Sequence, residues 1–218
     1  MTGSASPENA PNRQEQRSAQ TRRRVCAAAI ACLDERGYSE TSIQRVQERA
    51  GVSRGALMHQ FATKEDMIVE TLRRVLASTR HGQGLAGARR GGDGGGASME
   101  RDLLSLWSHL VDRPEGRAMV EILVAARTDA RLRAKIEPLL RTYEAEIGQD
   151  VLEIYESAGG SDEDVIQIWA ICRIFMRSLH LQQRFDPDPQ AARAMVRRFA
   201  ELVAPHLRRR RPPPANGD

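Results

Sequence analysis

The chain contains few aromatic residues and no long uncharged apolar run. Only 4% of its 218 residues are aromatic, although 40% are hydrophobic. Val, Ile, Thr and Tyr form no alternating runs of the kind that predict strands, whereas Ala, Leu, Arg, Glu and Gln, which favour helix, dominate. No stretch approaches the roughly 18 apolar residues that a membrane span needs. We therefore expect an all-α protein with no membrane partner.

The first residues of the chain bear on its location, and its net charge bears on its possible partners. Residues 1–12 are polar and lack the apolar core of a secretory signal, so we expect a cytoplasmic protein. The net charge is +4 and the sequence pI is about 9.3. This modest excess of basic residues permits nucleic-acid binding without arguing strongly for it.

Cysteine is also scarce, and its spacing does not fit a metal site. Cys26, Cys32 and Cys172 form no Cys-x-x-Cys pair and no His-containing metal spacing. Free cysteine usually packs as a small hydrophobic residue, so we expect three buried thiols rather than a redox switch. No Ser/His/Asp or Cys/His arrangement and no close carboxylate pair is apparent. The sequence therefore predicts no catalytic residues, no metal ligands and no cofactor.

Helical stripes and a glycine-rich stretch divide the chain into two domains. Residues 1–20 predict a disordered basic arm, and residues 21–79 contain four helical stripes. Eight glycines among residues 81–98 predict a flexible loop without the strand and helix context of a phosphate-binding loop. Five further stripes follow in residues 99–207, and residues 208–218 predict a disordered tail. The fold expected is all-α with about nine helices.

Two short helices at about residues 42–60 have the spacing of a helix-turn-helix. Thr41 or Ser42 can cap the first helix, and Thr41 with Gln44 fits a capping box. The Gly-Val-Ser run at 51–53 interrupts this helix, and its serine can cap a second, very short one. Two short helices joined by a tight glycine-containing turn are typical of a DNA-reading motif.

The residues around this motif resemble the DNA-binding domain of TetR-family transcriptional regulators. The resemblance is carried by Gly37-Tyr38, Thr41-Ser42-Ile43, Val46, the run from Arg49 to Leu57, Phe61 and Lys64-Glu65. It implies an N-terminal helix-turn-helix domain of three to four helices, followed by a helical ligand-binding and dimerisation domain. A stretch at 121–132 is similar to one found in many members of the family.

Two residues depart from the family pattern. The family usually has Tyr where this chain has Met58, and that Tyr commonly touches a backbone phosphate. Methionine cannot donate such a hydrogen bond, so this contact is missing or is supplied elsewhere. Gln47 stands where Ala is usual, which predicts altered packing or a half-exposed side chain.

Readout of DNA by such a motif needs side chains that match base edges in the major groove. Arg54 is the best candidate for a bidentate contact to guanine, and Met58 for a thymine methyl group. Gly55 lets the backbone approach closely. Gln44 and Arg45 can reach a base edge or a phosphate. The full predicted set is Thr41, Ser42, Gln44, Arg45, Ser53, Arg54, Gly55, Met58, His59 and Lys64, with Thr41, Ser42, His59 and Lys64 as phosphate contacts.

Arginines before the motif could add contacts to the DNA backbone or the minor groove, although they also fit an ordinary solvated surface. They are Arg13, Arg17 and the run Arg22 to Arg24. One short recognition helix binds DNA weakly, so the expected partner is a double-stranded operator with near-palindromic half-sites, read by a homodimer.

The family resemblance implies that the second domain encloses a cavity for a small apolar or amphipathic effector. The candidate lining residues are Trp107, Met119, Leu123, Arg127, Tyr143, Trp169, Phe175 and Met176, although each also fits an ordinary core position. The apolar faces of the last two helices, at about 162–207, predict a four-helix dimer interface with those of a second copy.

These observations predict a ligand-responsive, dimeric DNA-binding transcription regulator, a repressor that a small molecule releases from its operator. The alternative is a DNA-binding regulator with no small-molecule ligand, in which the second domain serves only dimerisation. A third class, an enzyme that uses the second domain, lacks any recognisable catalytic arrangement in the sequence.

Overall fold

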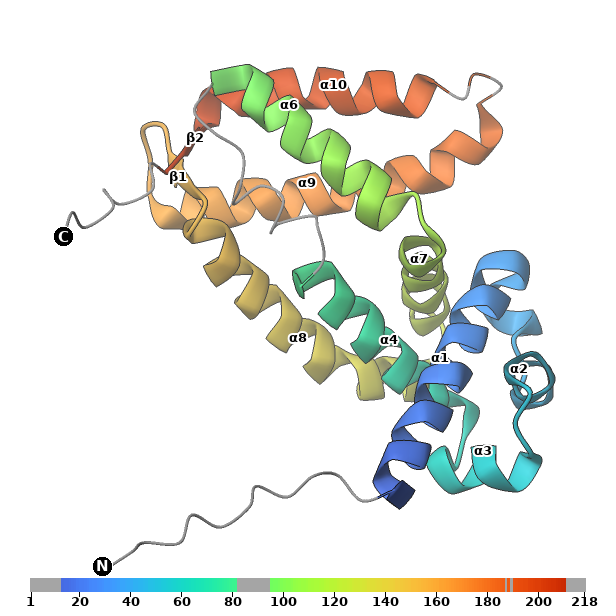
Figure 1. Cartoon of the computed structure of the whole chain (residues 1–218). Helices are drawn as coiled ribbons and strands as arrows, with labels where there is room; N and C mark the ends of the chain where they lie inside the picture. Colours follow the sequence, from blue (N-terminus) through green and yellow to red (C-terminus); the bar gives the residue numbers. More distant parts are fainter. Residues whose placement is uncertain (1–12, 82–94, 187, 189, 211–218) are drawn as a thin grey trace, which may run out of the picture.

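The computed structural model describes residues 13–81, 95–186, 188 and 190–210, and in these residues the chain is helical apart from one short β-ribbon (Figure 1). The prediction of an all-α fold is therefore confirmed, with the ribbon as an unpredicted addition. None of the described helices is both long enough and apolar enough to cross a membrane.

The first four helices contain the helix-turn-helix. They are α1 (Arg13–Glu40), α2 (Ile43–Ala50), α3 (Arg54–Gln60) and α4 (Lys64–His81). Helix α1 begins at Arg13, so the prediction that residues 13–20 are disordered is wrong. The Ser18 hydroxyl lies 2.9–3.1 Å from the Gln60 side-chain amide, which ties this early part of α1 to α3.

The predicted helix stop at Gly37 is found as a break inside α1. Gly37 has φ 74° and ψ 177°, a backbone conformation that is almost confined to glycine. The chain therefore bends before Glu40, where α1 ends, and then enters α2.

In the residues that the structure describes, the second domain is built from five α-helices and several short turns. They are α6 (Gly95–Leu106), a π-helical turn (Trp107–Val111), α7 (Pro114–Ala126), α8 (Ala130–Leu152), α9 (Asp162–Gln182) and α10 (Ala191–Val203), with 3-10 turns at 183–185 and 204–206. Helix α6 begins at Gly95, so the end of the predicted 81–98 loop is helical. Most of that loop, residues 82–94, lies outside the described residues.

The described part of the chain ends just after a short strand, where the sequence predicts a disordered tail. Strand β2 (Leu207–Arg209) pairs antiparallel with β1 (Tyr155–Ser157). Burial of the Leu207 side chain holds the strand in place. An ion pair of 3.9 Å between Arg209 and Asp102 adds a second attachment. The predicted tail is therefore wrong for residues 208–209, and residues 211–218 lie outside the described part.

The helices are arranged so that the two predicted domains share one core. Figure 1 shows α1, α2 and α3 at one end of the molecule and α6, α9 and α10 at the other, with α4, α7 and α8 between them. Buried apolar side chains form a single cluster that runs from Leu33 in α1 to Val196 in α10. Helix α1 packs against both α4 and α7, so the helix-turn-helix rests directly on the second domain.

Candidate nucleic-acid interface and ligand cavity

The helix-turn-helix is held by capping groups and a small buried stripe. The Ser42 and Ser53 hydroxyls cap α2 and α3 by accepting backbone N–H bonds of 3.2 Å from Arg45 and Ala56. Gly51 ends α2 in the left-handed conformation, with φ 59°. The buried side chains of Val46, Ala50 and Leu57 fix the motif on α1.

Thr41 does not play the role that the sequence predicts. Its side chain is fully buried, and its hydroxyl donates a 2.8 Å hydrogen bond to the Gly37 carbonyl. Gln44, the other half of the predicted capping box, donates instead to Glu48 at 3.0 Å. The predicted capping box is therefore wrong, and a phosphate contact from Thr41 would need its buried side chain to become exposed.

Most of the other predicted DNA-contacting residues lie on the exposed side of α2 and α3. Side chains or backbone are exposed at Ser42, Gln44, Ser53, Arg54, Gly55, Met58 and His59. An exposed Arg54 at the start of α3 and an exposed Gly55 beside it present guanidinium and bare backbone on one surface. This arrangement matches the geometry in which a recognition helix enters the major groove by its N-terminal residues.

Arg45 and Lys64 both form hydrogen bonds to other residues of the helix-turn-helix domain. Arg45 donates to the Glu40 carbonyl at 2.7 Å and to its carboxylate at 2.8 Å, and the second bond lowers the pKa of Glu40. Lys64 donates to the Tyr38 carbonyl at 2.7 Å and lies 4.0 Å from the centre of its ring. Burial lowers the pKa of Lys64 and raises that of Tyr38 to about 12. A phosphate contact from either cation would use its remaining N–H donors or replace one of these internal bonds.

One of the arginines before the motif, Arg24, has a structural role. Arg24 donates to the carbonyls of Ala50 and Gly51 at 2.7 and 2.9 Å, and so caps the C-terminal end of α2. Its neighbour Arg22 is exposed and lies 3.4 Å from the Ser18 hydroxyl. Arg24 therefore stabilises the turn of the motif in the free protein.

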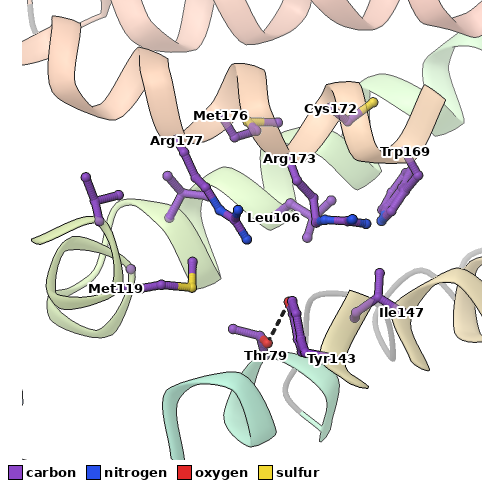
Figure 2. A pocket seen from close by; sticks show the side chains of 13 residues that line it. Thr79, Leu106, Met119, Tyr143, Ile147, Trp169, Cys172, Arg173, Met176 and Arg177 are labelled. Carbon is purple, nitrogen blue, oxygen red and sulfur yellow. Dashed lines mark hydrogen bonds between the residues drawn. The ribbon is translucent and has the colours of Figure 1, made fainter. Parts of the chain in front are cut away.

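A cavity lies in the second domain between α4, α7, α8 and α9. Its lining residues are Thr79, Leu106, Val111, Gly116, Met119, Val120, Tyr143, Ile147, Trp169, Cys172, Arg173, Met176 and Arg177. Figure 2 shows these side chains converging from separate helices on one space. The π-helical turn at 107–111 borders it through Val111.

Half of the predicted lining residues face this cavity. Met119, Tyr143, Trp169 and Met176 line it, whereas Trp107, Leu123, Arg127 and Phe175 do not. Trp107 is buried in the core, and Arg127 is exposed on the surface. Leu123 packs against the core from a half-buried position. Phe175 stacks on Phe199 of α10 with ring centres 4.1 Å apart.

Sequence reasoning missed the two arginines of the cavity, Arg173 and Arg177. They follow Trp169 at intervals of one helical turn and so share its face of α9. Their spacing from Trp169 in the sequence was the signal that could have placed both arginines at the cavity. Opposite them, the hydroxyls of Tyr143 and Thr79 are hydrogen-bonded at 3.0 Å (Figure 2).

Helix α7 connects the cavity to the DNA-reading end of the molecule. It lines the cavity with Met119, and two residues to either side of Met119 it carries Arg117 and Glu121, which bind α1. Arg117 forms an ion pair with Asp34, with one bond of 3.0 Å between Nη2 and Oδ2. Glu121 accepts a 3.3 Å hydrogen bond from the Tyr38 backbone N–H, just after the break at Gly37.

Metal chemistry has no support in the described part of the chain. No group of three His, Cys, Asp or Glu side chains there is placed to hold a metal ion. Cys26, Cys32 and Cys172 are buried and free, as predicted. Burial raises the pKa of each thiol, that of Cys172 to about 12, and so disfavours the reactive thiolate form.

Comparisons with known proteins agree with this geometry. The family model described as bacterial regulatory proteins, tetR family, matches residues 25–71. An uncharacterized HTH-type transcriptional regulator of Mycobacterium tuberculosis is 32% identical over 138 residues, which cover 62% of this chain and 67% of that protein. The HTH-type transcriptional repressor AcnR of Corynebacterium efficiens is 31% identical over 119 residues, 53% of this chain and 55% of that one.

The similarity of fold extends over the second domain as well. The crystal structure of a transcriptional regulator from Rhodococcus sp. Rha1 superposes with a TM-score of 0.63 at 22% sequence identity. The superposition covers 84% of this chain and 95% of that chain. Both the helix-turn-helix and the helical domain behind it are thus shared with known regulators.

Proposed function

Because the chain belongs to the TetR family of bacterial regulatory proteins, we propose that it is a homodimeric repressor that a small apolar or amphipathic molecule releases from a near-palindromic operator. Members of this family regulate transcription by binding DNA and are not enzymes. A repressor of bacterial genes meets its operator in the cytoplasm, which is the location we propose.

One observation carries the proposal of ligand response. The same helix, α7, lines the cavity through Met119 and binds the helix-turn-helix domain through Arg117 and Glu121. A ligand that moved α7 would therefore move α1 at the Gly37 break, because packed elements transmit displacement rather than absorb it. The alternative, a second domain used only for dimerisation, gives no reason for a cavity on this helix.

The homodimer is supported by apolar side chains that no described residue covers. They lie on α9, the turn after it and α10, and are Ile171, Ile174, Leu181, Phe185, Met195 and Leu202, each 46–85% exposed. Apolar residues gathered on two neighbouring helices mark an interaction surface, and a second copy of the same helices would complete a four-helix bundle. This supports an interface through residues of about 162–207.

A footprinting experiment on the DNA upstream of the gene and its neighbours tests the proposed function. We expect the purified protein to protect two half-sites whose centres lie about 10 base pairs, or a multiple of that, apart. Protection should be lost in Arg54→Ala but not in Arg141→Ala, an exposed arginine on α8. If no near-palindromic site is protected, the proposed regulator function is wrong.

A further inference from the structure

We propose that the effector is an amphipathic anion whose carboxylate is held between Arg173 and Arg177, with its apolar part against the walls of the cavity. This rests on the proposed function, because it names the chemical class of ligand for the same cavity. Three features of the structure support this proposal. They are the unpaired guanidinium groups in the cavity, the apolar lining of the cavity, and the separate apolar face of α9 that is proposed for the dimer.

The two guanidinium groups reach into the cavity. Arg173 and Arg177 lie one turn apart on α9, and Figure 2 shows both side chains extending inward, between Trp169 and Met119. Each is half-buried. Neither is hydrogen-bonded or ion-paired to any residue in the part of the chain that the structure describes. The cavity therefore holds two positive charges that its own walls do not neutralise.

An unpaired, half-buried charge such as that of Arg177 favours an anionic ligand. Burial lowers the pKa of Arg177, and the neighbouring charge of Arg173 acts in the same direction, although Tyr143 and Glu144 oppose it. Desolvated cations are stable only when they are paired. A carboxylate offers two oxygens to the planar donor fork of arginine, and such charge-assisted bonds are about twice as strong as neutral ones.

The remaining wall is suited to an apolar body rather than to a second charge. Leu106, Met119, Ile147, Trp169 and Met176 supply hydrocarbon, sulfur and indole surface. The described residues that line the cavity include no acidic side chain. The absence of acidic side chains among these residues disfavours a cationic ligand. The apolar lining disfavours an ion that has no apolar part.

The other two partners of the protein do not account for these arginines. The face of α9 proposed for the dimer carries Ile171 and Ile174, which are 55% and 62% exposed, whereas Arg173 and Arg177 line the cavity. The DNA-reading helices α2 and α3 lie at the opposite end of the molecule (Figure 1). A small anion inside the cavity is the partner that fits.

Calorimetric titration of the full-length protein with three matched ten-carbon probes tests the inference. The probes are decanoate and decylamine, each below its micelle concentration, and decanol, below its solubility limit. We expect decanoate to bind at least about tenfold more tightly than decanol, since one charge-assisted contact is worth that factor or more. Decylamine should bind most weakly. The double variant Arg173→Gln/Arg177→Gln should lose the preference for decanoate and keep the affinity for decanol.

Arg141→Gln on α8 is the matched control, because it removes a guanidinium outside the cavity. It should bind all three probes as the wild type does. The inference is overturned if folded wild-type protein binds decanol as tightly as decanoate, if it binds neither, or if the double variant keeps the preference. Footprinting of ligand-free protein tests the regulator function separately. Arginine-dependent binding of decanoate that left operator affinity unchanged would support the ligand class and contradict ligand-induced release.

Discussion

Arg54 is the exposed side chain best placed to read a base. It lies at the start of α3, beside the exposed backbone of Gly55, and the Ser53 cap holds the first turn of the helix. We expect Arg54→Ala to weaken operator binding by about 1–3 kcal/mol and to relax specificity at one base pair. Fluorescence anisotropy with a set of single-base operator variants measures both effects. An equal loss on every sequence would instead make Arg54 a phosphate contact.

Gly37 occupies a backbone conformation that other residues avoid. Its φ of 74° places it in a region almost confined to glycine, and a Cβ there would lie 2.9 Å from Oε2 of Glu121. We therefore expect Gly37→Ala to lower the free energy of unfolding by about 1–3 kcal/mol, as measured by urea denaturation.

Gly55→Ala is the control for this substitution. A Cβ at Gly55 meets nothing within 4 Å, and alanine favours helix over glycine by about 1 kcal/mol. Its stability should be unchanged or higher. If Gly37→Ala proves as stable as Gly55→Ala, the break in α1 imposes no strain on the chain.

For individual side chains, the sequence predicts which face of a helix they lie on but not their contacts with distant residues. Spacing and residue type placed Arg54, Gly55 and Met58 on the outer side of α3, because helical periodicity determines which positions face the core. The burial of Thr41 and the bonds from Lys64 to Tyr38 could not be predicted in this way. They depend on how α1 bends at Gly37 and brings residues distant in sequence together.

At the level of the helices, long periodic segments were predictable and chain ends were not. The capping pair Ser161 and Asp164 forms at the start of α9, because its residues are close in sequence. The early start of α1 depends on Ser18 meeting Gln60, and the β-ribbon depends on Leu207 finding a buried site. Long-range contacts of this kind leave no periodic pattern in the sequence.

The contact between α1 and α7 should couple the two domains energetically. Asp34 and Arg117 form a largely buried, two-pronged ion pair. A double-mutant cycle with Asp34→Asn and Arg117→Gln should give a coupling energy of about 1.5–3 kcal/mol, as expected for hydrogen bonds between charged groups. The exposed pair Glu137 and Arg141 on α8, treated in the same way, should give at most about 0.5 kcal/mol.

The same variants test communication between cavity and DNA. If α7 transmits the presence of a ligand, Arg117→Gln should weaken ligand-induced release of the operator while the ligand-free protein still binds it. Anisotropy with and without effector measures this release. If the effector releases the operator from Arg117→Gln as it does from the wild type, the contact between Arg117 and Asp34 does not transmit the ligand signal.

Helix α9 contains a buried histidine, His180, that should make stability depend on pH. Burial lowers the pKa of His180, and the charges of Arg117 and Arg184 lower it further, against the opposing effect of Asp112 and Asp34. The Gln183 amide nitrogen lies 2.8 Å from Nδ1 of this ring, a position that suits an unprotonated nitrogen.

Below about pH 6.5, the ordinary histidine pKa, the unfolded chain takes up a proton that folded His180 does not. The free energy of unfolding should therefore fall as the pH decreases from about 6.5 toward the lowered pKa of the folded state, with no loss from this group above that range. In His180→Gln the decline over this interval should be shallower. Urea denaturation at several pH values measures it, and parallel profiles for the two proteins would contradict the prediction.

At the scale of the whole molecule, the proposed reading of a near-palindrome needs two copies of the chain, because each recognition helix spans only α3 (Arg54–Gln60). Ile174 lies in the middle of α9 and is 62% exposed on the proposed dimer face. In a two-fold interface each substitution occurs twice, and an unpaired buried charge costs several kcal/mol. We expect Ile174→Glu to raise the dimer dissociation constant at least about 100-fold, as measured by sedimentation.

The loss of the dimer should carry over to DNA, because a monomer presents one recognition helix and cannot span two half-sites. Ile174→Glu should therefore lose its footprint on the near-palindrome although the helix-turn-helix, at the other end of the molecule, stays folded (Figure 1). Val124→Glu on α7 is the matched control, since Val124 is 51% exposed but lies outside α9 and α10. It should remain a dimer and bind DNA. A dimeric Ile174→Glu that still protects both half-sites would place the interface away from these two helices.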